Sequence, residues 1–289
     1  MAHYRYQIFV PGGNKTALVF GTAGLETDPA RRKEIQDCIL ARHEHDPDGE
    51  VEQVVGFIST DVSAPELIMT GGEFCGNATR TAAAYYLGGR AGEVTITVSG
   101  ASKPLQTGGS ETGEIWAEMP VFEELVSAVT PVSNGGYWVE MDGISHLILP
   151  QFPSEPYLRR ILSTDKSKEE QLNIALALLE ETIAENALSA GDAYGVMFLE
   201  PVLGMLKIHP FVHVKAAGTT YYETGCGSGT ICVGLVSSLL RGGSEKIRIL
   251  QPSNKTICAE IEQSADGKVR GKISGPVERG EIYEIEVIS

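Results

Sequence analysis

Two cysteines open matching motifs in the two halves of the chain. Residues 75–79 read Cys-Gly-Asn-Ala-Thr, residues 226–230 read Cys-Gly-Ser-Gly-Thr, and each motif leads into a segment that we expect to be helical. The first turn of a helix has unpaired N–H groups and positive potential, so it should favour a thiolate and lower the pKa of each cysteine below about 8.5. The same N–H groups can bind a carboxylate. If the two helix starts face each other, the sequence predicts a site for a small carboxylate between two sulfurs.

That arrangement suits the racemisation of an amino acid. The reaction needs a base on one face of the α-carbon and an acid on the other, and a thiolate and a thiol can exchange these roles. Helix N–H groups would also stabilise the enolate-like charge that develops when the α-proton leaves. No electron-accepting cofactor is then required. We expect no cofactor and no metal, because no pattern typical of pyridoxal phosphate, flavin, nucleotide or zinc binding is present.

The order of predicted elements repeats around the two motifs. Each motif is followed by a helix, a Gly-Gly pair and a strand, and an internal duplication is the economical explanation. It predicts an α+β fold with two similar lobes that face each other across a pseudo-twofold cleft, where the active site lies. We place the boundary near Val129, at the end of a turn-rich stretch, so that one lobe spans residues 1–128 and the other spans residues 129–276.

Hydrophobic patterning predicts the remaining elements. We expect a polar helix over residues 30–43 and an amphipathic helix over residues 164–188. The stretch from Lys103 to Gly136 reads as turns. The segments that read as strands or strand pairs are 7–21, 51–58, 66–70, 93–98, 136–149, 194–200, 205–214 and 246–250.

Composition excludes several classes of partner. The chain has 289 residues, of which 42% are hydrophobic, an ordinary globular composition. Its 23 Lys and Arg residues against 38 Asp and Glu residues give a net charge of −15, which disfavours nucleic acid as a partner. No apolar stretch approaches the roughly 18 residues of a membrane span, and the first residues lack a signal-peptide layout. We expect a cytoplasmic protein with neither a membrane nor a nucleic-acid partner.

Several polar residues are candidates for binding the substrate. The helix-start residues Gly76, Asn77, Gly227 and Ser228 are placed to bind a carboxylate. Glu223 could bind the ammonium group and Glu73 could do likewise, although an acid near a helix start is also favourable for the dipole alone. Other candidates for contacts with the amino acid are Asn14, Gln53 and His146. For Asn14 the alternative is a turn residue, and for His146 it is a satisfied residue of a strand.

The two cysteine motifs closely resemble those of the diaminopimelate epimerase family of cofactor-independent racemases. The family's first motif, Cys-Gly-Asn-Gly-x-Arg, corresponds to residues 75–80, and its second, Cys-Gly-(Ser/Thr)-Gly, corresponds to residues 226–229. A Gly13-Asn14 turn and His146 extend the resemblance over most of the chain. It implies two catalytic cysteines, Cys75 and Cys226. It also implies that each lobe is a mostly antiparallel, curved sheet around a central helix, and that the final strand, residues 277–289, joins the first lobe.

Departures from that family bear on the substrate. Diaminopimelate epimerases carry Glu-Arg-Gly before the second cysteine, and the arginine helps to hold the distal carboxylate; here Ala217 and Gly218 occupy those positions. The sequence is more similar to the histidine racemases of staphylopine-type metallophore synthesis, which share the patterns at residues 52–57, 71–79 and 222–230. The resemblance implies a basic amino acid, histidine or 2,4-diaminobutyrate, as the substrate. Diaminopimelate is the alternative.

Two functions of another class stay open. The protein could be a redox switch with a disulfide between Cys75 and Cys226, or a non-catalytic module that binds an amino acid. Cys38, Cys232 and Cys258 are predicted to be packed residues, although a disulfide between Cys226 and Cys232 is also open. A homodimer is one assembly that the sequence allows without specifying it.

Overall fold

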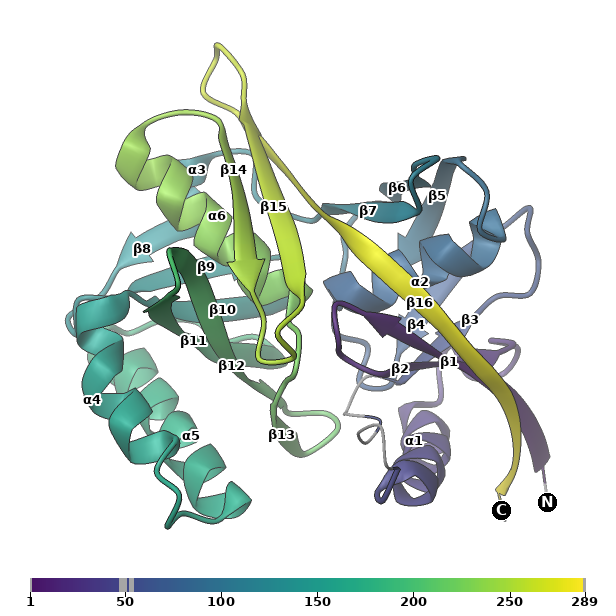
Figure 1. The fold of residues 1–289 in the computed structure, drawn as a ribbon. Coiled ribbons are helices and arrows are strands. Elements are labelled where there is room, and N and C mark those ends of the chain that lie inside the picture. The colour runs from purple at the N-terminus through teal and green to yellow at the C-terminus, as the bar shows by residue number, and fades with distance from the viewer. Residues whose placement is uncertain (1, 47–50, 52–54, 288–289) are drawn as a thin grey trace.

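Eight strands in the first half of the fold surround one helix. The computed structural model describes residues 2–46, 51 and 55–287. Hydrogen-bonded pairs run in the order β1-β2-β3-β4-β5-β6-β7-β16, and β16 also pairs with β1, which makes a ring. Helix α2 contacts every strand of this ring (Figure 1). The strands are β1 (Ala2–Pro11), β2 (Thr16–Phe20), β3 (Val55–Ile58), β4 (Glu66–Met69), β5 (Gly92–Val98), β6 (Leu105–Gly109), β7 (Glu114–Met119) and β16 (Val269–Val287), and the helices are α1 (Pro29–His43) and α2 (Gly76–Leu87).

The second half of the fold has a second sheet around a second helix. From β16 the pairing continues in the order β15-β14-β12-β11-β10-β9-β8, with β13 on β12, and helix α6 packs against most of these strands. The strands are β8 (Val129–Pro131), β9 (Tyr137–Met141), β10 (Ile144–Leu149), β11 (Ala193–Val202), β12 (Met205–Val214), β13 (Thr219–Tyr222), β14 (Glu245–Leu250) and β15 (Thr256–Gln263). The helices are α3 (Leu125–Ala128), α4 (Gln151–Ile161), α5 (Lys168–Glu185) and α6 (Gly227–Arg241).

Strand β16 joins the two halves. Its first residues pair with β15 and with β7, and its last residues, from Val277 to Val287, pair with β1. In Figure 1 this strand runs diagonally from the second sheet to the first. One core cluster accordingly includes residues of both halves, among them Met119, Ile231 and Ile273.

The two central helices are both buried, but their amino-acid compositions differ. Helix α2 is rich in alanine and small polar residues, so the surrounding strands can approach it closely. Helix α6 carries larger apolar residues such as Ile231 and Leu235, which are fully buried. Both helices end at a glycine in the left-handed conformation, Gly88 with φ 64° and Gly242 with φ 72°, a backbone that glycine adopts without strain. These are the Gly-Gly positions that marked the repeat in the sequence.

The α+β fold class is confirmed, and two local predictions are wrong. The stretch from Lys103 to Gly136, predicted as turns, contains β6 and β7, because its alternating residues face the α2 core. Helix α4 was not predicted, since Pro153 and Pro156 lie within it. Pro153 lies in the first turn, where it costs little because the first N–H groups have no helical partner anyway, whereas Pro156 lies inside the helix and removes one hydrogen bond. The predicted 164–188 helix begins at Lys168, after a capping box on Ser167.

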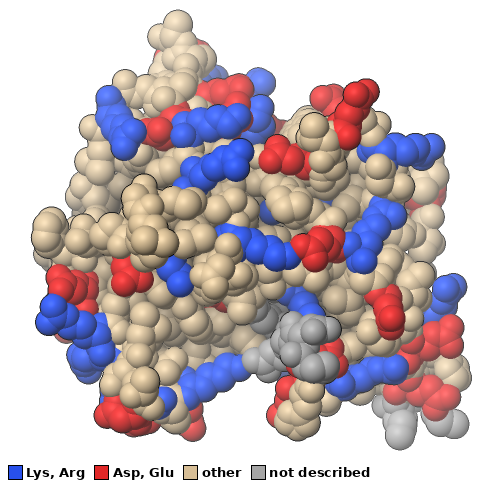
Figure 2. Space-filling model, in the orientation of Figure 1, with Lys and Arg blue, Asp and Glu red and all other residues tan. Residues whose placement is uncertain are grey.

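The surface of the described residues is mixed in charge. On the face shown in Figure 2, Lys and Arg side chains are interspersed with Asp and Glu. Within the described part of the chain, no helix is both long and apolar enough to span a membrane.

Candidate active site

The two motif cysteines stand immediately before the two central helices. Cys75 precedes α2 and Cys226 precedes α6, and both have extended backbones with φ of −136° and −125°. In each helix the threonine four residues later donates its hydroxyl to the cysteine carbonyl, Thr79 at 2.8 Å and Thr230 at 2.6 Å. The match in sequence therefore corresponds to a match in local structure.

The starts of α2 and α6 meet over β16. A Cβ added to Gly227 would lie 2.7 Å from Cδ1 of Ile273 and 3.1 Å from the backbone nitrogen of Asn77. A Cβ added to Gly76 would lie 2.9 Å from Cε of Met119. A side chain at either position would therefore have to displace the end of the Ile273 or the Met119 side chain. The glycine after each cysteine therefore allows the two helix starts to approach each other.

Cys75 and Cys226 line one small cavity. Its volume is about 30 Å³, whereas pockets that enclose a small-molecule ligand usually measure roughly 300–1,000 Å³. Its apolar wall consists of Met69, Phe74, Ile144, Val212 and Val214, and its remaining lining residues are Asn14, Glu73, Asn77, Glu223, Gly227 and Ser228. The structure thus brings both cysteines together with most of the predicted binding residues, in a state too narrow for an amino acid.

A short chain of hydrogen bonds reaches the Cys226 thiol. Its sulfur accepts the backbone N–H of Gly229 at 3.3 Å and lies 3.5 Å from the Ser228 hydroxyl. That hydroxyl lies 2.8 Å from Nε2 of His146. Burial lowers the pKa of His146 to about 3, with the Gly195 backbone acting in the opposite direction, so this histidine is neutral at physiological pH. His146 therefore reaches the thiol through Ser228.

The peptide before Cys226 is held by groups from both halves. The side-chain amides of Asn14 and Asn77 both donate to the Gly225 carbonyl, at 3.1 and 2.9 Å. The backbone N–H of Cys226 donates to Oε1 of Gln251 at 2.9 Å. Asn14 and Asn77 were expected to contact the amino acid; here both line the cavity and position this peptide. Gln251 was missed, because a lone glutamine after a strand gives no signal in the sequence.

Cys75 has a different environment. Part of the residue is exposed although its thiol is buried, and the thiol makes no capping hydrogen bond at the start of α2, where the N–H groups of Asn77 and Ala78 act on it only weakly. The adjacent Phe74 is buried. Among the described residues, no polar side chain links the Cys75 thiol to a histidine as Ser228 links the Cys226 thiol to His146. The two thiols are therefore similar in position and different in their polar partners.

The structure reverses the prediction that helix starts lower the pKa of the cysteines. Burial, followed by the negative charge of Glu223, raises the pKa of Cys75 to about 12. The same two causes raise the pKa of Cys226. Backbone N–H groups of both helices act in the opposite direction but are outweighed. Both cysteines are therefore thiols at neutral pH in this structure.

Two buried acids complete the cavity. Glu223 is 7% exposed, and its charge is the second-largest cause of the raised pKa at both cysteines. Part of Glu73 reaches the surface, but its Oε2 is buried and makes no hydrogen bond with the described residues. Burial raises the pKa of the Glu73 carboxyl, and the Arg32 charge and nearby backbone N–H groups only partly oppose it. No Lys, Arg or His side chain is among the described residues that line the cavity.

The structure locates all but one of the remaining residues that the sequence singled out. Gln53 lies outside the described residues. Gly76 packs at the start of α2, one residue from Cys75. All described cysteines are free thiols, and Cys232 and Cys258 are buried as predicted, whereas Cys38 is partly exposed. Among the described residues, no group of three or more His, Cys, Asp and Glu side chains is arranged to hold a metal ion.

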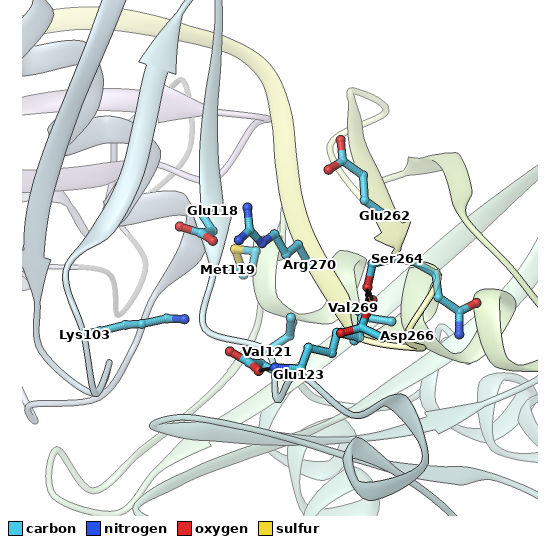
Figure 3. A pocket seen from close by; sticks show the side chains of 12 residues that line it. Lys103, Glu118, Met119, Val121, Glu123, Glu262, Ser264, Asp266, Val269 and Arg270 are labelled. Atoms are coloured by element: carbon cyan, nitrogen blue, oxygen red, sulfur yellow. Dashed lines mark hydrogen bonds and ion pairs between the residues drawn. The ribbon is translucent and has the colours of Figure 1, made fainter.

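A larger hollow lies away from the cysteines. It measures about 540 Å³ and lies between the Lys103 region, the end of β7 and the β15–β16 hairpin (Figure 3). Its lining mixes cations such as Lys103 and Arg270 with acids such as Glu118 and Glu123. None of the predicted site residues lines it. We therefore assign the chemistry to the small cavity, which holds both thiols and both buried acids.

Comparison with known proteins identifies a family for this chain. The family model described as "Histidine racemase CntK N-terminal domain" matches residues 9–283. A histidine racemase of Fusobacterium nucleatum subsp. nucleatum is 28% identical over 227 residues, which cover 74% of this chain and 77% of that protein.

Solved structures share the fold at low identity. A phenazine biosynthesis protein of the PhzF family from Bacillus anthracis superposes with a TM-score of 0.63 at 13% identity, covering 99% of this chain and 100% of that one. A hydroxyproline epimerase from Agrobacterium vitis, with bound trans-4-hydroxy-L-proline, superposes with a TM-score of 0.58 at 13% identity, covering 98% and 92%. These likenesses concern the fold alone.

Proposed function

Because the chain belongs to the family described by the histidine racemase CntK N-terminal domain, we propose that it racemises a cationic amino acid, with histidine as the first candidate and 2,4-diaminobutyrate as the second. Membership confirms the resemblance inferred from the two cysteine motifs and makes the chain an isomerase of the amino-acid racemase class. The observation that carries the proposal is that Cys75 and Cys226, each at a helix start, line one cavity with two buried acids.

In the proposed reaction the two thiols act on opposite faces of the α-carbon. One cysteine, as thiolate, removes the α-proton, and the opposite thiol gives its proton to the other face. The first sulfur ends as a thiol and the second as a thiolate, so protons balance and the reverse reaction exchanges the roles. The reaction needs no pyridoxal phosphate, because the N–H groups at the starts of α2 and α6 are suited to hold the substrate carboxylate as negative charge develops on it.

Substrate binding would supply the thiolate that the closed site disfavours. The negative charge of Glu223 raises the pKa of both thiols. An ammonium group bound beside Glu223 would offset that charge, and the thiol pKa values would fall when the substrate arrives. Coupling thiolate formation to binding in this way would protect the free enzyme from oxidation, since the thiolate is the reactive form.

The small cavity implies that the two halves move. We propose that residues 1–128 with the final strand 277–289 form one lobe, that residues 129–276 form the other, and that they are related by a pseudo-twofold axis. A volume of about 30 Å³ cannot admit histidine, so the lobes would separate for entry and close over the substrate. Closure that excludes water strengthens the electrostatic contacts of the site.

Diaminopimelate fits this cavity less well than an amino acid with a cationic side chain does. A second substrate carboxylate would need a cationic partner, and the described lining contributes only acids as charged groups. Burying an uncompensated carboxylate beside Glu73 and Glu223 would cost several kcal/mol. The cavity therefore favours a cationic side chain over an anionic one.

The decisive experiment is exchange of the α-proton in D2O. Purified protein under reducing conditions is incubated with single L-amino acids, and the α-proton signal is followed by NMR. The panel contains histidine, 2,4-diaminobutyrate, ornithine, lysine, glutamate and diaminopimelate. We expect exchange and loss of optical activity with histidine or 2,4-diaminobutyrate. Saturable binding without exchange would instead favour a binding module, and a reversible thiol-dependent conformational change without turnover would favour a redox switch.

A further inference from the structure

Glu73 is a buried acid that the two-thiol reaction does not use. It lies in the turn between β4 and Cys75 and lines the cavity with the two cysteines. Its Oε2 is buried and has no hydrogen-bond partner among the described residues. Arg32 acts on Glu73 electrostatically, but its guanidinium donates to the carbonyls of Thr70, Leu25 and Glu26, and no ion pair with Glu73 is formed.

A buried carboxylate oxygen without a hydrogen bond is costly for a protein to keep, even where backbone N–H groups, here those of Gly71 and Glu73, act on the same carboxyl group. Leaving such a group without a hydrogen bond costs about 1–3 kcal/mol, and more if it is charged. Most buried polar atoms are paired, so an exception inside a cavity points to a missing partner. A partner for a carboxylate is an N–H donor or a cation. The missing partner of Glu73 therefore has the chemistry of an ammonium or an imidazole N–H.

The two acids of the cavity can be assigned to different parts of an amino acid. Glu223 lines the cavity together with both thiols, and its charge is the largest that acts on each of them, so we assign it to the part of the cavity where the α-carbon would lie. It is the natural partner of the α-ammonium. Glu73 stands two residues before Cys75, and its charge raises the pKa of Cys75 less than the charge of Glu223 does. Glu73 thus lies farther from the reacting centre, on the Cys75 side.

We propose that Glu73 binds the cationic or N–H-bearing side chain of the substrate and is the residue that selects such amino acids over neutral ones of the same shape. This inference rests on the proposed function. The apolar residues Met69, Phe74 and Val214 would contact the flanks of the side chain, while Glu73 accepts a hydrogen bond from its polar end. An imidazole ring, apolar on its faces and a donor at its edge, fits this combination.

The test compares two ring systems in wild-type protein and Glu73→Gln. L-Histidine and L-3-(2-thienyl)alanine have five-membered rings of similar size, but the thiophene has no N–H and no charge. The readouts are α-proton exchange in D2O, as kcat/KM, and binding by calorimetry. Glu73→Gln removes the charge and keeps the shape. We expect it to reduce the preference for histidine over thienylalanine by about ten- to hundredfold, the usual effect of losing a hydrogen bond to a buried charged group.

Two further variants separate this role from a structural one. Glu223→Gln should weaken both substrates equally, since both carry the α-ammonium. Glu93→Gln, on an exposed position of β5, is the matched control for removal of one carboxylate. A preference for histidine that is the same in Glu73→Gln as in wild type would overturn the proposal, even if the enzyme racemises histidine.

Failure of the proposed function would look different. Wild-type protein that binds histidine without exchanging its α-proton would refute the racemase. The calorimetric preference for histidine over thienylalanine, and its loss in Glu73→Gln, would still decide the role of Glu73. If Glu73→Gln unfolds, Glu73→Asp gives the same comparison, because it keeps the charge but withdraws it by one methylene and should retain part of the preference.

Discussion

The starts of α2 and α6 have the same local backbone structure but different polar side chains. Both place a cysteine before the helix, both have a threonine hydroxyl on the cysteine carbonyl, and both need glycine as the first helical residue. They differ at the second helical residue. Asn77 reaches across to the Gly225 carbonyl, whereas Ser228 stays within its own half and lies between His146 and the Cys226 thiol.

This difference indicates a division of labour between two copies of one motif. The Asn77 side chain ties the start of α2 to the peptide before Cys226. The Ser228 side chain connects Cys226 to a neutral buried histidine, so it affects the thiol itself. Cys75, partly exposed and without such a partner, depends more on closure of the site and on the substrate for its environment.

The largest expected effect is the loss of either thiol. Cys75→Ser and Cys226→Ser should each lower kcat/KM for racemisation by about 10²–10⁴, the usual contribution of a general acid or base. Polarimetry measures racemisation, and NMR in D2O measures exchange from each enantiomer separately. If the thiols act on opposite faces, the two variants should favour opposite enantiomers in the exchange assay. A single variant that racemises at the wild-type rate would refute the two-base model.

The next effect tests whether the helix starts must touch. Gly227→Ala would place a methyl group 2.7 Å from Ile273 Cδ1, and overpacking of this kind costs about 1–3 kcal/mol. We expect the free energy of unfolding in urea to fall by that amount. Gly191→Ala is the control, because a Cβ there has no atom within 4 Å. Equal stability of the two variants would show that the Ile273 side chain can shift to make room without cost.

A smaller effect distinguishes Ser228 from Asn77. Ser228→Ala removes the partner of His146 Nε2 and should destabilise the protein by about 1–3 kcal/mol. It should also raise the pKa of Cys226 further, because the Ser228 hydrogen bond lowers that pKa. Asn77→Ala should cost about 0.5–1.5 kcal/mol and leave the Cys226 thiol environment unchanged. Unfolding in urea and titration of thiolate absorbance measure the two quantities, and identical thiol titrations would contradict the division of labour.

The smallest expected effect is a change in the pH at which the two thiols ionise. Glu223→Gln removes a negative charge that raises the pKa of both thiols, so the thiolate is stabilised and both pKa values should fall. The thiolate absorbance should therefore appear at lower pH than in wild-type protein, for which the Cys75 pKa is about 12. Glu93→Gln should leave the titration unchanged. An unchanged or higher thiol pKa in Glu223→Gln would show that burial alone sets the titration.

The main elements of the fold were predictable where local pattern and tertiary environment agree. Helices α1, α2, α5 and α6 and the strands on either side of them follow from periodicity, small-residue helix starts and Gly-Gly ends. Helix α4 escaped prediction because Pro153 and Pro156 argue locally against a helix, while packing of Leu158 and Ile161 against the second sheet favours one. Strand β6 was not predicted because its glycines resemble a turn, although a Cβ at Gly108 would lie 2.6 Å from the Trp116 ring, and β7 was not predicted because the residues around it are typical of turns.

The two cysteines, the duplicated helix starts and the reaction class could be identified from the sequence, because residue type and spacing suffice to place a thiol at a helix terminus. The titration of those thiols and their surroundings depend on the fold. Burial and the charge of Glu223 outweigh the helix N–H groups, and neither burial nor the distance between residues far apart in the chain can be read from spacing. The same is true of the Ser228–His146 contact and of the unpartnered Glu73 carboxylate, which exist only because the fold brings distant segments to one cavity.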